Sequence, residues 1–312
     1  MNILSAAFLV PLFAAGVRVC VPLLLGSVGE ITAQKTGVMN IGLEGQMLIA
    51  ALFAFLAAYK SGSLLAGIAA GVAAGMLGAL LVAFWCVSRR QDQSVVGIMF
   101  NIFALGFTNF LYRASFGVST DKAKVDILPT LELPLLSKIP YVGEVLFKQN
   151  ALVYTAVGMA LLTLFIHKCT KFGLQITAAG ENPKAALAAG ISVPRMRYFG
   201  YLFSGGMAGL AGAFLSLGMV GTFTENMSAG RGFICLAITI LARWNPLSAV
   251  GAALLFGTVQ ALQLRLQALG SPLPYQFFVA LPYLVTLLSL MLFGRNIRAP
   301  KDLGNPYTKE SR

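Results

Sequence analysis

The chain has 312 residues, of which 57% are hydrophobic and only 11% are charged. A soluble domain carries about 25% charged residues, so this composition cannot cover a surface that faces water. With a mean hydropathy of +0.79, the chain needs lipid as its solvent and is expected to cross a membrane several times.

The net charge of +12 raises the question of nucleic-acid binding. The basic residues, however, stand in short clusters between apolar segments, such as Arg89–Arg90, Lys168 to Arg197 and Arg295 to Arg312. Such clusters are typical of loops that face a negatively charged cytoplasmic leaflet. Because no basic face with interleaved aromatic residues occurs, we expect membrane lipid and no nucleic acid as a partner.

Apolar segments of the length that a membrane helix needs, about 20 residues, recur along the chain. The sequence therefore predicts an all-α polytopic membrane protein with about nine transmembrane helices, within a range of eight to ten. We expect one transmembrane domain over residues 1–293 and a basic cytoplasmic tail over 294–312. The predicted spans are 3–25, 43–59, 64–87, 94–112, 150–167, 198–219, 231–243, 247–267 and 275–293.

The placement of Lys and Arg predicts the orientation of these spans. With the N-terminus outside and the C-terminus inside, about twice as many basic residues lie inside as outside, and loop 113–148 faces outward. A re-entrant segment near residue 30 is the alternative, and it would change the parity of the first span.

Two stretches of the sequence look alike. Residues 23–32 read LLLGSVGEIT and residues 215–224 read LSLGMVGTFT, and each is followed by a polar stretch and three apolar spans. Under the predicted orientation they begin on opposite sides, which indicates inverted repeats over 3–112 and 198–293 linked by the span 150–167. Transporters built in this way bind solute near the midplane, where broken helices meet. Chance resemblance is the alternative.

Glycines at four-residue spacing occur in two of the predicted spans. They are Gly67, Gly71 and Gly75 in one, and Gly205 and Gly209 in another. Small residues at this spacing let helix backbones approach closely in lipid, so both spans are expected to pack tightly.

The motifs of several enzyme classes are missing from the sequence. It contains no GxxxxGK[ST], GxSxG or HExxH pattern, its four cysteines form no CxxC pair, and its single histidine is His167, at the predicted cytoplasmic end of a span. We therefore expect no catalytic residue, no metal site and no cofactor on this chain. We also expect that the chain is not an enzyme.

The segment from Gly29 to Gly45 combines polar residues with four glycines between two apolar spans. Glu44 stands where the next span begins, and an acid at a helix centre costs about 2.5–3.5 kcal/mol and usually faces a polar cavity or a partner. We expect a discontinuous element that lines a solute path, with a surface loop as the alternative. The candidate path residues, which suit a neutral polyhydroxylated solute, are Asn40, Glu44, Thr222, Thr224, Glu225 and Asn226.

A short capped helix is predicted in the basic loop after the fifth span. Asn182 is a good N-cap, Pro183 suits the first helical position and Gly190 suits the residue past the end. A helix of about seven residues is not stable alone. It is therefore expected to dock on a partner, with an ordinary connector as the alternative.

Three motifs carry a resemblance to a known family: GVMNIGLEGQM at 37–47, GENPKAALAAGI at 180–191 and GRGFICLAITILARWNP at 230–246. The chain resembles, over roughly residues 3–293, the permeases of bacterial ABC importers in the branched-chain amino acid, ribose and nucleoside group. The NIGLEG core is closest to the nucleoside-type members. The chain departs mildly from the family pattern at Lys35, Gln46 and Cys235.

The resemblance implies a transmembrane permease subunit in a bacterial inner membrane, with ATP bound and hydrolysed on a separate ATPase subunit. It also implies a second permease, identical or different, and an extracytoplasmic solute-binding protein. Residues 29–45 and 221–231 would lie near the translocation path. The coupling helix, which contacts the ATPase, would comprise Gly180, Glu181, Asn182, Pro183, Lys184, Ala185, Ala186, Ala189 and Gly190.

Two other functions stay open at this point. An ion-coupled secondary transporter would explain an inverted repeat and an embedded Glu44 equally well. An ABC permease for a simple sugar would use similar path residues.

Overall fold

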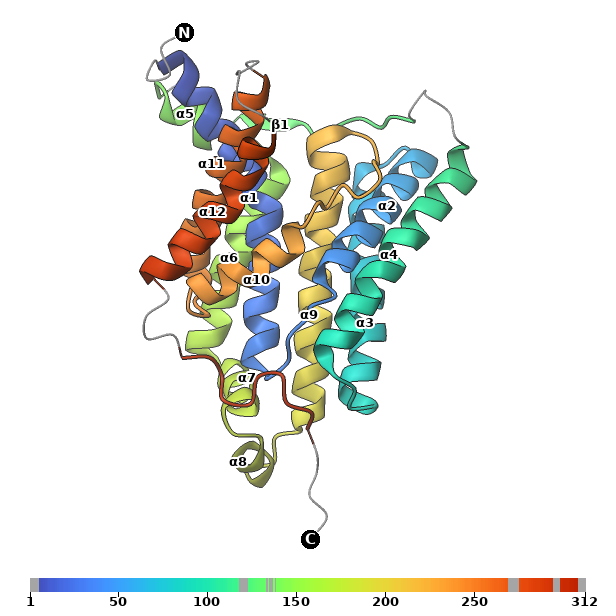
Figure 1. The fold of residues 1–312 in the computed structure, drawn as a ribbon, viewed down its shortest axis with the longest axis vertical. Helices are drawn as coiled ribbons and strands as arrows, with labels where there is room; N and C mark the ends of the chain where they lie inside the picture. Colours follow the sequence, from blue (N-terminus) through green and yellow to red (C-terminus); the bar gives the residue numbers. More distant parts are fainter. Residues whose placement is uncertain are drawn as a thin grey trace.

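The computed structural model describes residues 6–117, 123–132, 134, 137, 139–268, 275–293 and 298–307. These residues are mostly helical, and most of the helices run along the long axis of the molecule (Figure 1). The strands described are β1 (Thr130–Glu132) and β2 (Lys148–Asn150), which pair antiparallel with Leu131 opposite Gln149. The prediction of an all-α polytopic membrane protein is confirmed.

The first half of the chain forms a bundle around one long helix. This helix, α1, is followed by the extended segment 36–42, after which α2 rises to the upper end of the molecule (Figure 1). The elements of this half are α1 (Ala6–Lys35), α2 (Leu43–Ser61), α3 (Leu64–Ala83), the π-helical turn η1 (Phe84–Ser88) and α4 (Gln93–Phe116).

The second half repeats this order of elements. A long helix is again followed by a non-helical segment, 221–230, which turns back into the bundle before the short helix α10 (Figure 1). Its elements are α9 (Val193–Ala213), the π-helical turn η3 (Phe214–Val220), α10 (Arg231–Leu241), α11 (Pro246–Ala268) and α12 (Tyr275–Phe293).

The two halves are joined by helices at both ends of the molecule. On the upper side lies α5 (Val142–Leu146) with the strand pair, and α6 (Ala151–Cys169) then descends through the bundle. At the lower end lie two short helices, α7 (Lys171–Glu181) and α8 (Pro183–Ala188) (Figure 1). The start of α1 and the segment 298–307 lie at opposite ends, as the predicted orientation requires.

Seven of the described helices are long and apolar enough to cross a membrane, and Arg231–Leu241 and Gln276–Ser289 are shorter apolar helical segments. They match the nine predicted spans in order, but the first predicted boundary is wrong. Instead of ending at residue 25, α1 continues to Lys35. Its polar side chains are buried with partners in the bundle: Ser27 donates to the Leu23 carbonyl at 2.6 Å, and Gln34 donates to Glu30 at 2.8 Å.

The predicted glycine packing is present between α3 and α9. A Cβ at Gly75 would lie 2.8 Å from the Cα of Gly209, and a Cβ at Gly209 would lie 2.8 Å from the Gly71 carbonyl oxygen. The two backbones are therefore in contact, which only small residues at these positions allow.

The two similar stretches stand at different distances from the ends of their helices. Gly26 lies inside α1, whereas Gly218 lies in η3 close to the helix end. The turns that end the two long helices are at Gly37 (φ +90°) and Gly221 (φ +71°), where the left-handed backbone favours glycine. The inverted repeat and its register stay a prediction.

Candidate functional site

The start of α2 and the start of α10 meet at Glu44. One carboxylate oxygen accepts a hydrogen bond from the backbone N–H of Gly230 at 2.8 Å, and the other accepts from Gly232 at 2.6 Å. The first N–H groups of a helix have no partner within the helix, and the helix dipole favours a negative charge there. Glu44 is therefore the cap of α10, and it ties the first half of the chain to the second.

This contact depends on close backbone approach. A Cβ at Gly232 would lie 2.6 Å from the backbone nitrogen of Glu44. Any larger residue at position 232 would separate α10 from α2 and lengthen both hydrogen bonds. The GLEG motif at the start of α2 and the GRG motif at the start of α10 are thus two sides of one junction.

Asn40 lies in the extended segment 36–42 and is fully buried. Its side-chain amide donates to Gln46 at 2.7 Å and to the Ser204 hydroxyl at 2.9 Å, and it accepts from Gln46 at 3.0 Å. In this conformation Asn40 is enclosed by the bundle. Its contact with a solute stays a prediction, and such contact requires these hydrogen bonds to open.

A second carboxylate, Glu30, lies beside Asn40, although the sequence did not single it out as a candidate path residue. One oxygen of Glu30 accepts from the Gln34 amide at 2.8 Å and from the Asn40 backbone N–H at 3.1 Å. Gln34 in turn accepts from the indole N–H of Trp244 at 2.6 Å. The other Glu30 oxygen is buried without a partner, and such a group is costly to bury.

The remaining predicted path residues lie together at the turn after η3, away from Asn40. The Thr222 hydroxyl donates to the Ala123 carbonyl at 2.9 Å, and exposed Glu225 forms an ion pair with Arg113 of α4 at 2.7 Å. Thr224 is half-buried, and Asn226 is exposed with φ +55°. The six candidate residues therefore occupy three places rather than one cavity, and their role as path residues stays a prediction.

The short helix α8 has the capping that the sequence predicts. The Asn182 side chain accepts from the Ala185 N–H at 3.1 Å, Pro183 is in the first turn, and Gly190 follows the helix with φ +81°. One expectation is wrong. Ala186 was expected on the face that meets a partner, but it is 2% exposed and packs against its own chain, whereas Ala189 is exposed.

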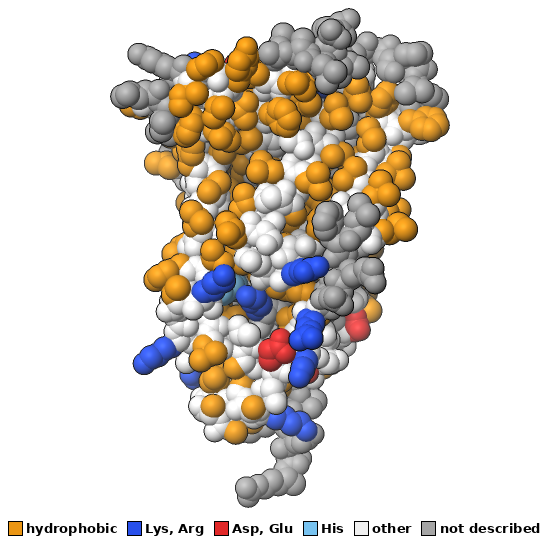
Figure 2. Space-filling model, turned by 90° about the vertical axis from the view of Figure 1, so that its left-hand side faces the viewer, with side chains coloured by type: hydrophobic (Ala, Val, Ile, Leu, Met, Phe, Trp, Pro, Cys, Tyr) orange, Lys and Arg blue, Asp and Glu red, His pale blue; other side chains and the backbone are white. Residues whose placement is uncertain are grey.

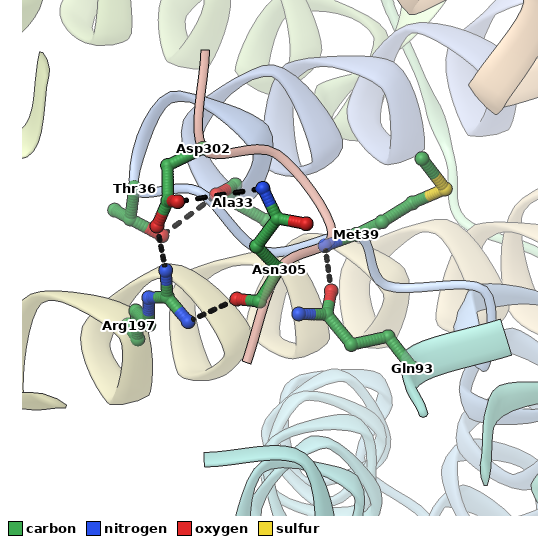
Figure 3. A network of polar contacts seen from close by, with 7 residues as sticks. All are labelled: Ala33, Thr36, Met39, Gln93, Arg197, Asp302 and Asn305. Carbon is green, nitrogen blue, oxygen red and sulfur yellow. Dashed lines mark hydrogen bonds and ion pairs between the residues drawn. The ribbon is translucent and has the colours of Figure 1, made fainter. Parts of the chain in front are cut away.

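The end of α7 packs on the break that follows α1. A Cβ at Gly180 would lie 2.8 Å from the backbone nitrogen of Gly37. Gln93 of α4 holds the same extended segment from the other side, because its side chain accepts from the Met39 N–H at 2.7 Å (Figure 3). The end of α7 and segment 36–42 are therefore in direct contact.

The predicted cytoplasmic tail is not a free tail over its described part. Residues 298–307, here called the C-terminal strap, run beneath the bundle (Figure 1). The Asp302 N–H donates to the Gly180 carbonyl at 2.9 Å, and the Gly304 N–H donates to the Gly37 carbonyl at 3.2 Å. The strap thus bonds to both sides of the contact between α7 and the break after α1.

Arg197 of α9 anchors this strap (Figure 3). It is 1% exposed, forms an ion pair with Asp302, and donates to the Asn305 carbonyl at 2.7 Å. Removing one member of a buried pair leaves an uncompensated charge, so this anchor is sensitive to substitution. Residues 294–297 and 308–312 of the predicted tail lie outside the described residues.

The fold and these contacts define a polytopic membrane protein with two interrupted helices joined within the bundle and a compact helical element, α7 and α8, at its lower end. The sequence pattern of the family described as branched-chain amino acid transport system / permease component matches residues 12–293. The chain belongs to this family. It is the membrane-spanning permease subunit of an ABC transporter and not its ATP-hydrolysing enzyme.

Curated relatives cover most of the chain. The guanosine ABC transporter permease protein NupQ of Bacillus subtilis (strain 168) is 37% identical over 93% of this chain and 94% of its own length. The nucleoside ABC transporter permease protein NupC of Lactococcus lactis is 33% identical over 92% and 93%. TsgC13 of Haloferax volcanii, a permease protein assigned to glucose transport, is 34% identical over 85% and 80%. No solved structure matches.

Proposed function

We propose that this chain forms half of the translocation path of an ATP-driven nucleoside importer in a bacterial inner membrane. Two relatives named for guanosine or nucleoside transport align with more than nine-tenths of the chain, at 37% and 33% identity. Nucleosides are neutral and polyhydroxylated, and the amide and hydroxyl groups of Asn40, Gln46 and Ser204 suit such a solute once their mutual hydrogen bonds open.

The observation that carries the coupling mechanism is the contact of Gly180 with Gly37. An ATPase subunit that binds α8 pushes on α7, and α7 bears directly on the start of segment 36–42. That segment leads to Glu44, which caps α10 in the other half. A displacement at the cytoplasmic surface thus reaches both interrupted helices through bonded or packed groups.

The proposed partners of this chain are the other subunits of an ABC importer. ATP binds to the ATPase subunit that contacts the region Gly180 to Gly190, and a second permease, identical or different, completes the path. An extracytoplasmic solute-binding protein delivers the solute to the end of the molecule that carries β1, β2 and α5. The two halves, 3–112 and 198–293, are inverted repeats linked by α6, in the register that pairs Gly37 with Gly221.

A sugar importer is the second candidate function, because TsgC13 is 34% identical. Uptake by proteoliposomes that contain the whole transporter separates the two. Labelled guanosine should accumulate only with ATP inside and binding protein outside, and unlabelled guanosine but not glucose should compete. Accumulation of labelled glucose but not of labelled guanosine favours the sugar importer, and uptake driven by an ion gradient without ATP contradicts both.

A further inference from the structure

A cavity of about 280 Å³ opens at the cytoplasmic end of the bundle, between α1, α6, α7, the turn from α10 to α11 and the C-terminal strap. Figure 2 shows Lys and Arg side chains gathered in the lower half of this side of the molecule, beneath a belt of hydrophobic side chains. The ionisable side chains that line the cavity are Lys35, His167, Lys168, Glu181, Arg243 and Arg298.

The charges in this cavity are unbalanced. Among the described residues that line it, four side chains are cationic and one, that of Glu181, is a carboxylate; of the four cations, Arg243 has a further interaction within the chain. Within the described part of the chain, no carboxylate lies within ion-pair distance of Lys35, Lys168 or Arg298. Cations confined together repel one another, and an anion that enters lowers the free energy of all of them.

His167 lines the same cavity without presenting a free ring nitrogen to it. Its Nε2 lies 3.3 Å from the Thr32 hydroxyl, and its Nδ1 is enclosed by protein atoms and has no partner. The groups that can meet a ligand are therefore the lysine and arginine side chains, which are donors only. A phosphate group offers both the negative charge and the acceptor oxygens that suit them.

The position of the cavity favours a lipid as the source of that phosphate. Lys168 is in the last turn of the membrane-spanning helix α6, and Leu164, one turn earlier, also lines the cavity. Leu161 and Phe165 on the same helix are 51% and 58% exposed, so they offer an apolar surface to acyl chains just above the cationic groups. A free phosphate ion has no apolar part that could cover that surface.

We propose that this cavity binds the headgroup phosphate of an anionic phospholipid of the cytoplasmic leaflet. Lys35, Lys168 and Arg298 supply the charge, and the acyl chains lie along α6. Because the cavity is bounded by α7 and the strap, the bound lipid contacts both of these elements, through which movement of α8 is proposed to be transmitted. Basic pockets on the cytoplasmic side of membrane helices favour such headgroups.

Tryptophan fluorescence tests this proposal on the full-length chain. The chain has two tryptophans, so Trp85→Phe leaves Trp244, which lines the cavity, as the only emitter. In phosphatidylcholine vesicles, phosphatidylglycerol brominated near the headgroup end of its acyl chains should quench Trp244 at a lower mole fraction than phosphatidylcholine brominated at the same carbons. Adding Lys168→Gln should weaken this preference by about fivefold.

Lys171→Gln is the matched control, because Lys171 is an exposed cation three residues further on that does not line the cavity. It should keep the preference. The Trp244 emission maximum, measured before brominated lipid is added, reports whether a variant keeps this tryptophan buried. If Lys168→Gln exposes Trp244, Arg298→Gln is used in its place. Equal quenching by the two lipids, or equal losses in Lys168→Gln and Lys171→Gln, overturns the proposal. Abolition of the preference by inorganic phosphate at matched ionic strength assigns the cavity to free phosphate and overturns the lipid source.

Discussion

The carboxylate of Glu44 accepts a hydrogen bond from the backbone N–H of Gly230, 186 residues further along the chain. With the second bond from Gly232, it joins the starts of α2 and α10. In Glu44→Gln an amide NH₂ faces one of these N–H donors, so the variant should lose roughly 1–3 kcal/mol of stability and most ATP-dependent uptake. Thermal unfolding of the purified chain and guanosine uptake measure the two effects, while co-purification of the ATPase should be unchanged.

Glu225→Gln is the control for the stability measurement only, because Glu225 is itself a candidate path residue. Its ion pair with Arg113 is exposed, and such pairs contribute about 0–1 kcal/mol. Wild-type stability and uptake in Glu44→Gln would show that the link between the halves has no mechanical role.

Gly180→Ala tests the contact between α7 and the break after α1. Because the added methyl group would lie 2.8 Å from the Gly37 nitrogen, overpacking should cost about 1–3 kcal/mol and shift segment 36–42. We expect ATP hydrolysis by the assembled transporter to continue while uptake falls. Gly158→Ala on α6, where an added Cβ meets no atom within 4 Å, is the control and should transport normally.

The exposed end of α8 is predicted to contact the ATPase. Ala189→Glu should insert normally but bury a charge in that interface, which weakens co-purification of the ATPase and abolishes uptake. Gly190→Val should have the same effect, because valine is strained at φ +81°. An ordinary connector would tolerate Ala189→Glu, so full uptake and normal co-purification would contradict the coupling role.

Arg197 and Arg195 form a matched pair two residues apart on α9. Arg197 is buried with Asp302, whereas Arg195 is exposed. Arg197→Gln should reduce stability by about 2–3 kcal/mol through loss of the C-terminal strap, and Arg195→Gln should stay within about 0.5 kcal/mol of the parent. Limited proteolysis from the cytoplasmic side should release the C-terminus faster in Arg197→Gln only. Equal rates would mean that Arg197 does not hold the strap.

The orientation can be tested by cysteine labelling in a chain without its four native cysteines. Lys124 and Lys301 are both exposed and lie on opposite sides in the predicted orientation. An impermeant maleimide should modify Lys124→Cys in intact spheroplasts, and Lys301→Cys only after the membrane is opened. Labelling of Lys301→Cys from outside would refute the N-out, C-in assignment.

Hydropathy was sufficient to predict the order of the spans, because each span carries its own apolar signal. It failed at the end of α1, where the polar residues Ser27, Glu30 and Gln34 suggested a loop. These side chains are tolerated inside the bundle because they find hydrogen-bond partners there, both from nearby residues such as Asn40 and from a distant segment through Trp244. No short stretch of sequence predicts which side chains will pair in this way.

The capping pattern around α8 was visible in the sequence because Asn182, Pro183 and Gly190 lie within nine consecutive residues. The strap was not, since Arg197 and Asp302 are 105 residues apart and Asp302 stands in a segment whose composition suggests a basic tail. An acid that directly follows Lys301 in a mostly basic segment was the only available signal. The three separate locations of the path residues likewise depend on tertiary contacts.

The strap also has a consequence for the order of assembly. Residues 302–305, which bond to Gly37, Gly180 and Arg197, follow α12 in the chain and are therefore made after every described membrane-spanning helix. The junction between α7 and the break after α1 thus stays incomplete until α12 has left the ribosome. A chain that stopped after α12 would contain all the described spans yet lack this closure.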